Sequence, residues 1–129
     1  MRGSKGPSQR QLRVGEEIRH ILVTALSHRH SGNAILDGAS ITVTEVRVSP
    51  DLQNATVFIL PLGGQDTPKI LIAFKEMSWF FRREVAHQLQ TRIAPRLVFE
   101  ADISFDEADR IEKLLSSPKV KRDIEREKP

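Results

Sequence analysis

Residues 41–60 read ITVTEVRVSPDLQNATVFIL and contain two strand-like segments with a turn between them. The flanking segments, 41–49 and 55–60, are rich in β-branched side chains, which is typical of β-strands. Between them, Ser49-Pro50-Asp51-Leu52 has proline at the second position of a turn, where its fixed φ is favourable. This stretch therefore predicts a β-hairpin.

A third strand is predicted downstream of the hairpin, over residues 97–105. Apolar and mainly polar side chains alternate there, as expected of a strand with one buried face. The residues predicted to face the core are Leu97, Phe99, Ala101, Ile103 and Phe105. Phe58 and Phe74 are predicted to join the same core because of their spacing.

The first helix is predicted over residues 9–28. Ser8 and Gln11 match a capping box, and apolar residues recur at helical spacing from Val14 to Leu26. Residues 33–40, which follow, are predicted to form a loop.

A second helical region is predicted from Thr67 to Ala94. Thr67 is expected to be the N-cap with Pro68 at the first helical position, and Pro95 ends the region. A single helix of this length is about twice the average for globular proteins. We therefore expect a kink at Met77-Ser78-Trp79.

Together these elements predict an α+β domain with the order α-β-β-α-kink-α-β-α, in which the helices pack on one face of a three-stranded sheet. Asp106 is expected to cap the last helix. We expect one domain over residues 9–117, preceded by a flexible basic tail over 1–8. A disordered charged tail is expected over 118–129, because it lacks apolar anchors.

The composition excludes several classes of protein. The 129 residues contain no cysteine, which excludes disulfide frameworks, thiolate zinc sites and cysteine nucleophiles. The longest apolar run, 70–74, is far too short to span a bilayer, and the first residues show no secretory signal. We therefore expect a cytoplasmic protein that is not bound to a membrane.

The net charge of +3 is unevenly distributed along the chain. Residues 1–30 and 67–99 each carry six basic and two acidic side chains, whereas 31–66 and 100–117 are mainly acidic. This alternation indicates either a basic face that binds a polyanion or ordinary solvated helix surfaces. The candidates for phosphate contacts are Arg10, Arg13, Arg19, Lys75, Arg82, Arg83, Arg92 and Arg96.

No known catalytic or cofactor-binding motif is found in the sequence. The histidines at positions 20, 28, 30 and 87 lack the spacing of metal ligands or of a nucleophile's partner. The acidic residues from Asp102 to Asp109 lack the spacing of a calcium loop, and a solvated helix start explains them. We expect no metal, no cofactor and no small-molecule substrate.

Trp79 is the only tryptophan, and two roles are open for it. An indole can stack on an unpaired nucleobase. With Phe80 and Phe81 beside it, however, a position in the core is favoured.

Two motifs together resemble a known family. The hairpin contains Val-Ser-x-Asp-Leu-x-x-Ala, and residues 92–97 contain Arg-Ile-x-Pro-x-Leu. With residues 13–19 and 111–115, they resemble the ribosome-binding factor A family over about residues 10 to 116. The resemblance implies a type II KH-like fold with the element order given above. Where the family has an Ala-x-Gly kink, this chain has Met77-Ser78-Trp79, and we expect the Ser78 hydroxyl to bend the helix by bonding to the backbone.

The resemblance also implies a function. Members of this family are non-enzymatic assembly factors that bind the free 30S small ribosomal subunit and its 16S rRNA. They assist late maturation, including processing at the 5′ end of the rRNA, and matter most in the cold. The chain is accordingly expected to be a monomer whose eight candidate basic residues contact rRNA phosphates.

Other functions stay open on the residues themselves. The main alternative is a general single-stranded RNA-binding module of the KH type that is not tied to the ribosome. A small nuclease that uses His87 or the 102–109 carboxylates is a weaker alternative, because no spacing supports it. An adaptor role for the acidic last helix is compatible with RNA binding.

Overall fold

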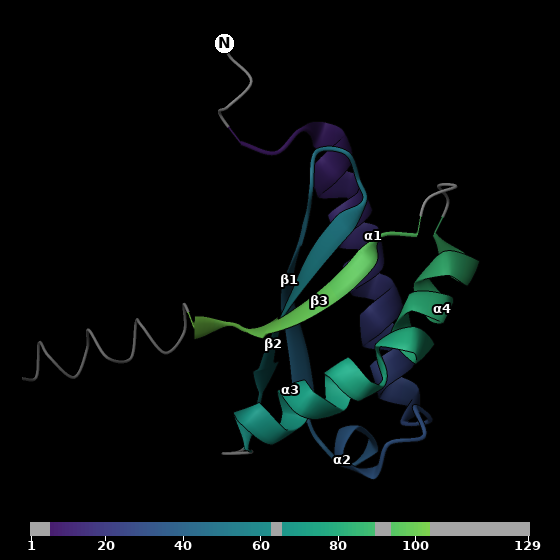
Figure 1. Ribbon diagram of the computed structural model, residues 1–129, viewed down its shortest axis with the longest axis vertical. Coiled ribbons are helices and arrows are strands. Elements are labelled where there is room, and N and C mark those ends of the chain that lie inside the picture. The colour runs from purple at the N-terminus through teal and green to yellow at the C-terminus, as the bar shows by residue number, and fades with distance from the viewer. Residues whose placement is uncertain (1–5, 63–65, 90–93, 104–129) are drawn as a thin grey trace, which may run out of the picture.

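The computed structural model describes residues 6–62, 66–89 and 94–103, and Figure 1 shows how its elements are arranged. The elements are α1 (Gln9–His28), α2 (Ala34–Asp37), β1 (Ile41–Val48), β2 (Asn54–Pro61), α3 (Thr67–Glu76), α4 (Ser78–Gln88) and β3 (Arg96–Ala101). Apart from α2, this is the predicted order as far as β3. The predicted last helix, Phe105 and the tail over 118–129 lie outside the described residues.

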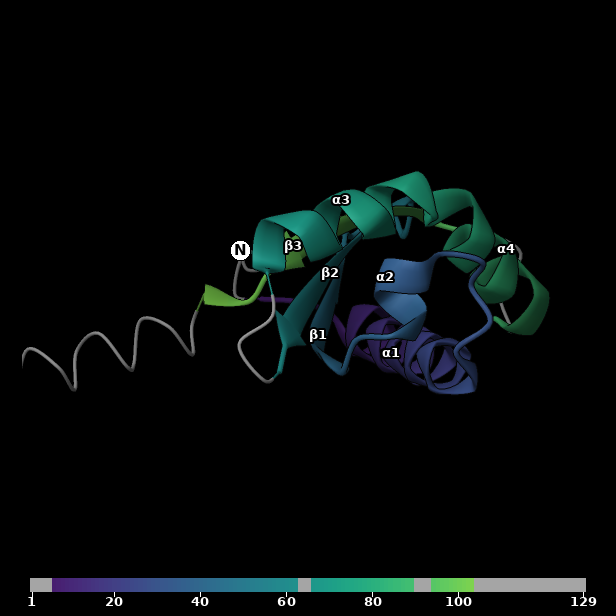
Figure 2. The ribbon, with the colours of Figure 1, turned by 90° about the horizontal axis from the view of Figure 1, so that it is seen from below.

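The three strands form one sheet in the order β1-β2-β3. β1 and β2 pair antiparallel, and β3 joins β2 in parallel because the α3–α4 crossover carries the chain back to the same end of the sheet. Val43, Val57 and Leu97 are buried beneath the helices, whereas Val98 on the opposite face is exposed. The described helices thus cover one face of the sheet, as predicted (Figure 2).

Short hydrogen bonds close the hairpin between β1 and β2. The Ser49 hydroxyl donates to the Asp51 carboxylate (2.6 Å), which also accepts from the backbone N–H of Gln53 (3.0 Å). The Ser49 oxygen in turn accepts from the backbone N–H of Asn54 (3.0 Å). Leu52 has a left-handed backbone (φ 60°) that disfavours leucine, and burial of its side chain offsets this strain. These contacts account physically for the Val-Ser-x-Asp-Leu pattern.

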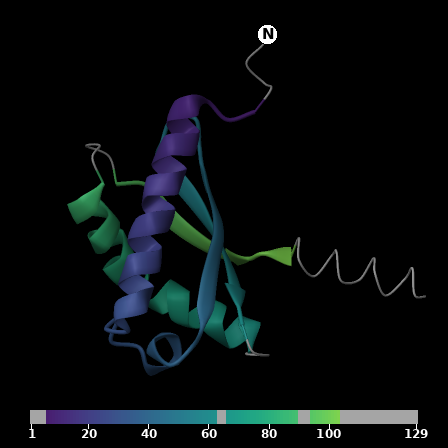
Figure 3. The same cartoon turned by 180° about the vertical axis from the view of Figure 1, so that it is seen from behind.

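α1 runs along the hairpin (Figure 3). Its predicted capping box is confirmed, since Gln11 and Ser8 exchange backbone-to-side-chain hydrogen bonds. The Gln11 side chain also donates to the Val48 carbonyl (2.8 Å), which ties the start of α1 to the end of β1. Gly15 lies against β1, where an added Cβ would be 2.6 Å from the Val46 carbonyl oxygen. Only glycine permits so close an approach of helix and strand.

The interruption between α3 and α4 lies at Met77, within the segment predicted to kink. Met77 has φ −100° and ψ 15°, and its N–H still donates to the Ala73 carbonyl (3.0 Å). A negative φ is open to any residue, so this bend does not need glycine. No side-chain hydrogen bond caps α4 at the break, so the expected contribution of Ser78 is not found and the Met77 backbone makes the bend.

Both ends of the second helical region differ from prediction. Asp66, not Thr67, is the N-cap, because its carboxylate accepts from the backbone N–H of Lys69 (3.2 Å). α4 ends well before Ala94, because Leu89 takes an extended backbone (φ −72°, ψ 138°) and buries its side chain in the core. The sequence pattern did not reveal that the helix ends before Leu89.

Two further boundaries are corrected. The loop predicted over 33–40 contains α2, because the Asn33 side chain accepts from two backbone N–H groups and the turn buries Leu36. β3 ends at Ala101, short of the predicted end of the third strand. Ile103 is 62% exposed, so its predicted place in the core is wrong.

Phe74 and Phe81 are fully buried in the core, and the half-buried Phe99 packs against both, with the three ring centroids 4.7–5.8 Å apart. The predicted core positions of Phe74 and Phe99 are therefore confirmed. The prediction for Phe58 is wrong. Phe58 alternates with buried residues of β2 and so lies half-buried on the open face, with the Arg47 guanidinium 4.9 Å from its ring centroid.

Candidate nucleic-acid interface

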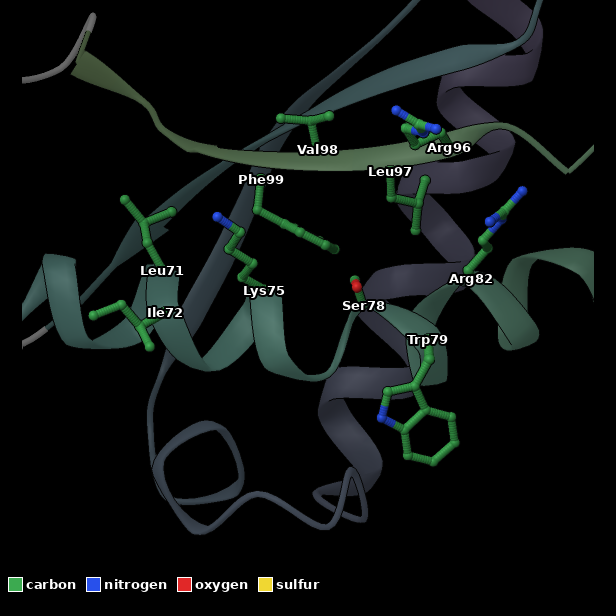
Figure 4. A pocket seen from close by; sticks show the side chains of 10 residues that line it. All are labelled: Leu71, Ile72, Lys75, Ser78, Trp79, Arg82, Arg96, Leu97, Val98 and Phe99. Carbon is green, nitrogen blue, oxygen red and sulfur yellow. The ribbon is translucent and has the colours of Figure 1, made fainter.

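A groove of about 600 Å³ opens between the bent α3–α4 segment and β3 (Figure 4). Its apolar wall is formed by Leu71, Ile72, Leu97, Val98 and Phe99. Ser78 and Trp79 line it where α3 gives way to α4. Because β3 is at an edge of the described sheet, the groove lies at the margin of the sheet rather than inside the core.

Among the described residues that line the groove, every charged side chain is positive. They are Lys75 on α3, Arg82 on α4 and Arg96 on β3, and all three residues are exposed. None of them forms an ion pair with another described residue. Positive charge outside ion pairs attracts a polyanion, and its N–H donors are free for phosphate oxygens.

The groove is assembled from three elements (Figure 4). Lys75 and Arg82 are placed on either side of the break at Met77, so the kink sets their relative positions. On the opposite wall, Leu97 and Phe99 point toward the helices, whereas Arg96 lies toward the outer side of the strand. The groove thus offers apolar side chains and cations side by side.

Trp79 is at the rim of this groove and is 57% exposed. Its predicted position in the core is wrong, because Phe81 occupies that position and is fully buried. Residues two apart lie on nearly opposite sides of a helix, so the two rings cannot share one face of α4. The Arg83 guanidinium lies over the indole, with Cζ 5.2 Å from the ring centroid.

The other candidate basic residues do not line the groove. Arg10 and Arg13 are exposed on α1, and Arg92 lies outside the described residues. Arg19 is held by Glu16, with a guanidinium nitrogen 2.6 Å from a carboxylate oxygen. This hydrogen bond raises the pKa of the Arg19 guanidinium and lowers the pKa of the Glu16 carboxyl. The structure therefore brings together three of the eight candidates, with Arg83 beside them.

The apolar wall of the groove was missed from the sequence. Ile70 and Phe74 already supply the buried face of α3, yet Leu71 and Ile72 give the helix a second apolar side. A surface helix needs only one apolar face, which is the face that packs against the core. This second apolar side of α3, together with the exposed Val98 on β3, is the feature that could have revealed a binding surface.

Neither a metal site nor a membrane-spanning helix is found in the part of the chain that the structure describes. Over residues 6–62, 66–89 and 94–103, no three acidic or histidine side chains are grouped so that they could hold a metal ion. In the same ranges, no helix is long and apolar enough to cross a membrane. The carboxylates from 104 to 109 lie outside these ranges.

Known proteins match nearly the whole chain. The family model for ribosome-binding factor A matches residues 10–115. The ribosome-binding factor A of Paramagnetospirillum magneticum is 51% identical over 124 residues, which cover 96% of this chain and 87% of the relative. That of a Bradyrhizobium species is 50% identical over 125 residues, which cover 95% of this chain and 91% of the relative.

The fold is shared with solved structures. The crystal structure of ribosome-binding factor A from Thermus thermophilus superposes with a TM-score of 0.59 at 19% identity, over 70% of this chain and 94% of that one. The element order, the bent helix pair and the groove at the sheet edge define a KH-like domain. Within that class, the chain belongs to the ribosome-binding factor A family.

Proposed function

We propose that this chain binds the free 30S small ribosomal subunit and contacts its 16S rRNA through the groove. The observation that carries this proposal is the rim of Lys75, Arg82 and Arg96 around an apolar wall, with no acidic side chain in the described lining. Membership of a family named for ribosome binding supports the ribosome as the source of the RNA.

The proposed action is binding without chemistry. By binding one rRNA conformation more tightly than others, the protein shifts the rRNA toward that conformation. This assists late maturation, including processing at the 5′ end, and matters most in the cold, where rRNA helices rearrange slowly. The protein acts as a cytoplasmic monomer without a cofactor. The other candidates, which do not line the groove, are proposed to supply further phosphate contacts: Arg10, Arg13, Arg19, Arg83 and Arg92.

Co-sedimentation tests the proposal. The purified chain is centrifuged with isolated small subunits and with assembled ribosomes, at low and at near-physiological salt. We expect binding to free subunits that survives the higher salt, with little binding to assembled ribosomes. Equal binding to both that disappears as salt rises would overturn the proposal and favour the general single-stranded RNA-binding alternative.

Substitution of the rim tests the role of the groove. Lys75→Ala, Arg82→Ala and Arg96→Ala should each weaken subunit binding and reduce the salt slope by about one. Arg47→Ala is the matched control, because Arg47 lies on the open face of the sheet and is paired with Glu45 (2.8 Å). A salt slope that stays the same in all three rim variants would remove the groove from the interface.

A further inference from the structure

Trp79 lines the basic groove on the α4 side, and its exposed indole points away from β3 (Figure 4). We infer that the groove binds single-stranded RNA with one unpaired base stacked on the indole of Trp79. This inference rests on the proposed function, because it specifies the ligand of the same groove. It goes further by assigning a base contact to a residue that carries no charge.

The exposure of apolar side chains is the first support. Trp79 is 57% exposed, and Ile72 (58%) and Val98 (43%) line the same groove. Single exposed apolar residues are common, but several around one groove with a charged rim mark an interaction site. A ligand that covers them removes apolar surface from water, and a nucleobase offers a flat apolar face of matching size.

The surroundings of the indole are the second support. Arg83 Cζ lies over the ring at 5.2 Å, and the Phe80 ring meets it edge-on, at an interplanar angle of 82°. In the described part of the chain, no other ring or cation stacks on Trp79. Arg83 therefore covers one face of the indole, and the inference places the base on the opposite face.

Charge selects a nucleic acid strand over a peptide. Lys75, Arg82 and Arg96 line the groove, and none of the described lining residues is acidic. A single strand carries one phosphate for each base. Its phosphates can therefore contact the cations at the rim while its bases contact the apolar wall. A duplex cannot bind in this way, because its bases are already stacked and paired.

The intrinsic fluorescence of the protein reports directly on this contact. The chain has one tryptophan and no tyrosine, so the indole emission comes from Trp79 alone. We would titrate the full chain with an oligoadenylate RNA of about eight nucleotides, which is within the usual site size of single-strand binders. Two probes of matched length serve as controls, an abasic ribose-phosphate oligomer and polyglutamate. We expect saturable quenching by the RNA and none by either control.

Substitution of Trp79 supplies the second measurement, by fluorescence anisotropy of labelled oligoadenylate. Trp79→Leu should weaken binding between about 5-fold and 150-fold, the range found for loss of one base–aromatic stack. Trp79→Phe should retain much of the affinity, because a smaller ring still stacks. Val23→Ala is the matched control, since Val23 is an exposed apolar residue on α1 (41%) away from the groove. Circular dichroism confirms that each variant is folded.

The outcomes separate this inference from the proposed function. Unchanged affinity of Trp79→Leu overturns the inference, and so does equal quenching by the abasic oligomer or by polyglutamate. If these results occur while co-sedimentation with free subunits persists, the inference fails and the proposed function stands. If the RNA quenches Trp79 but subunits are not bound, the stacking contact holds and the ribosomal function fails.

Discussion

The half of the molecule built from α1 and the hairpin uses its polar side chains differently from the half that contains the groove. In the first half, Arg19 and Arg47 are paired with neighbouring carboxylates, and Ser49 and Asp51 satisfy the turn backbone. In the second half, the cations that line the groove form no ion pair with a described residue. The named polar groups of the first half therefore satisfy partners within the fold, whereas the cations of the groove remain available to a ligand.

This comparison separates stability from binding. Changes to buried side chains and to the contacts of the α1–hairpin half should lower the free energy of unfolding, whereas changes to the exposed residues that line the groove should reduce binding and leave stability intact.

Phe81→Ala should have the largest effect, a loss of about 3–5 kcal/mol. Phe81 is fully buried, and its ring contacts those of Phe74 and Phe99. Urea unfolding followed by circular dichroism measures the change. Trp79→Leu, two residues earlier, is the control and should alter stability by less than about 0.5 kcal/mol. Equal losses in the two variants would contradict the assignment of Trp79 to the surface.

Gly15→Ala should cost about 1–3 kcal/mol, even though alanine is favoured over glycine in a helix by about 1 kcal/mol. The added Cβ would be 2.6 Å from the Val46 carbonyl oxygen, so α1 would have to move away from β1. Thermal unfolding measures the loss. Thr24→Ala, on the exposed side of α1, is the control and should be neutral or stabilising. A stabilised Gly15→Ala protein would show that the close approach is not real.

Asp51 should make stability depend on pH in acid. The hydrogen bond from the Ser49 hydroxyl, with that from the Gln53 backbone, lowers the pKa of the Asp51 carboxyl in the folded state. The carboxylate therefore adds stability above its unfolded pKa of about 4, and this is lost as pH falls through the lowered folded value. Asp51→Asn keeps an acceptor for Gln53 and removes the titration. The advantage of the wild type over this variant should shrink as pH falls, in urea unfolding from about pH 5 to 2. A constant difference across that range would argue against the hydrogen bond.

The triple variant Lys75→Ala, Arg82→Ala and Arg96→Ala should have the smallest effect on stability, within about 0.5 kcal/mol of the wild type. The three side chains are exposed and have no described ionic partner to lose. Urea unfolding and subunit co-sedimentation on the same sample measure stability and binding together. A large loss of stability would show that the rim supports the fold, and the division between the two halves would not hold.

Local features made most of the fold predictable from sequence. The turn at Ser49, the capping box at Ser8 and the alternation in the third strand each depend on residues a few positions apart. The exit of Leu89 from α4 was missed because it depends on burial against distant residues. The position of Trp79 was missed for a simpler reason. Phe80 and Phe81 follow it directly in the sequence, but successive residues of a helix lie on different faces, so a buried Phe81 does not imply a buried Trp79.

The candidate site was only partly predictable. The sequence identified the basic residues on the helices, because charge is read directly from composition. It did not show that Lys75, Arg82 and Arg96 meet around one apolar groove. That grouping depends on the parallel pairing of β3 with β2, where Asn54 is opposite Arg96. Parallel pairing leaves no short-range signal in the sequence.

The parallel β3 also affects the order in which the protein folds. The hairpin closes over a short stretch of chain, whereas the pairing of Asn54 with Arg96 closes a much longer loop at a higher entropic cost. Synthesis proceeds from the N-terminus, so α1 and the hairpin leave the ribosome before β3 does. Among the described helices and strands, the wall of the groove that β3 forms is therefore the last to be added. A chain whose synthesis has stopped before β3 contains α1, the hairpin and the bent helix pair but lacks one wall of the groove.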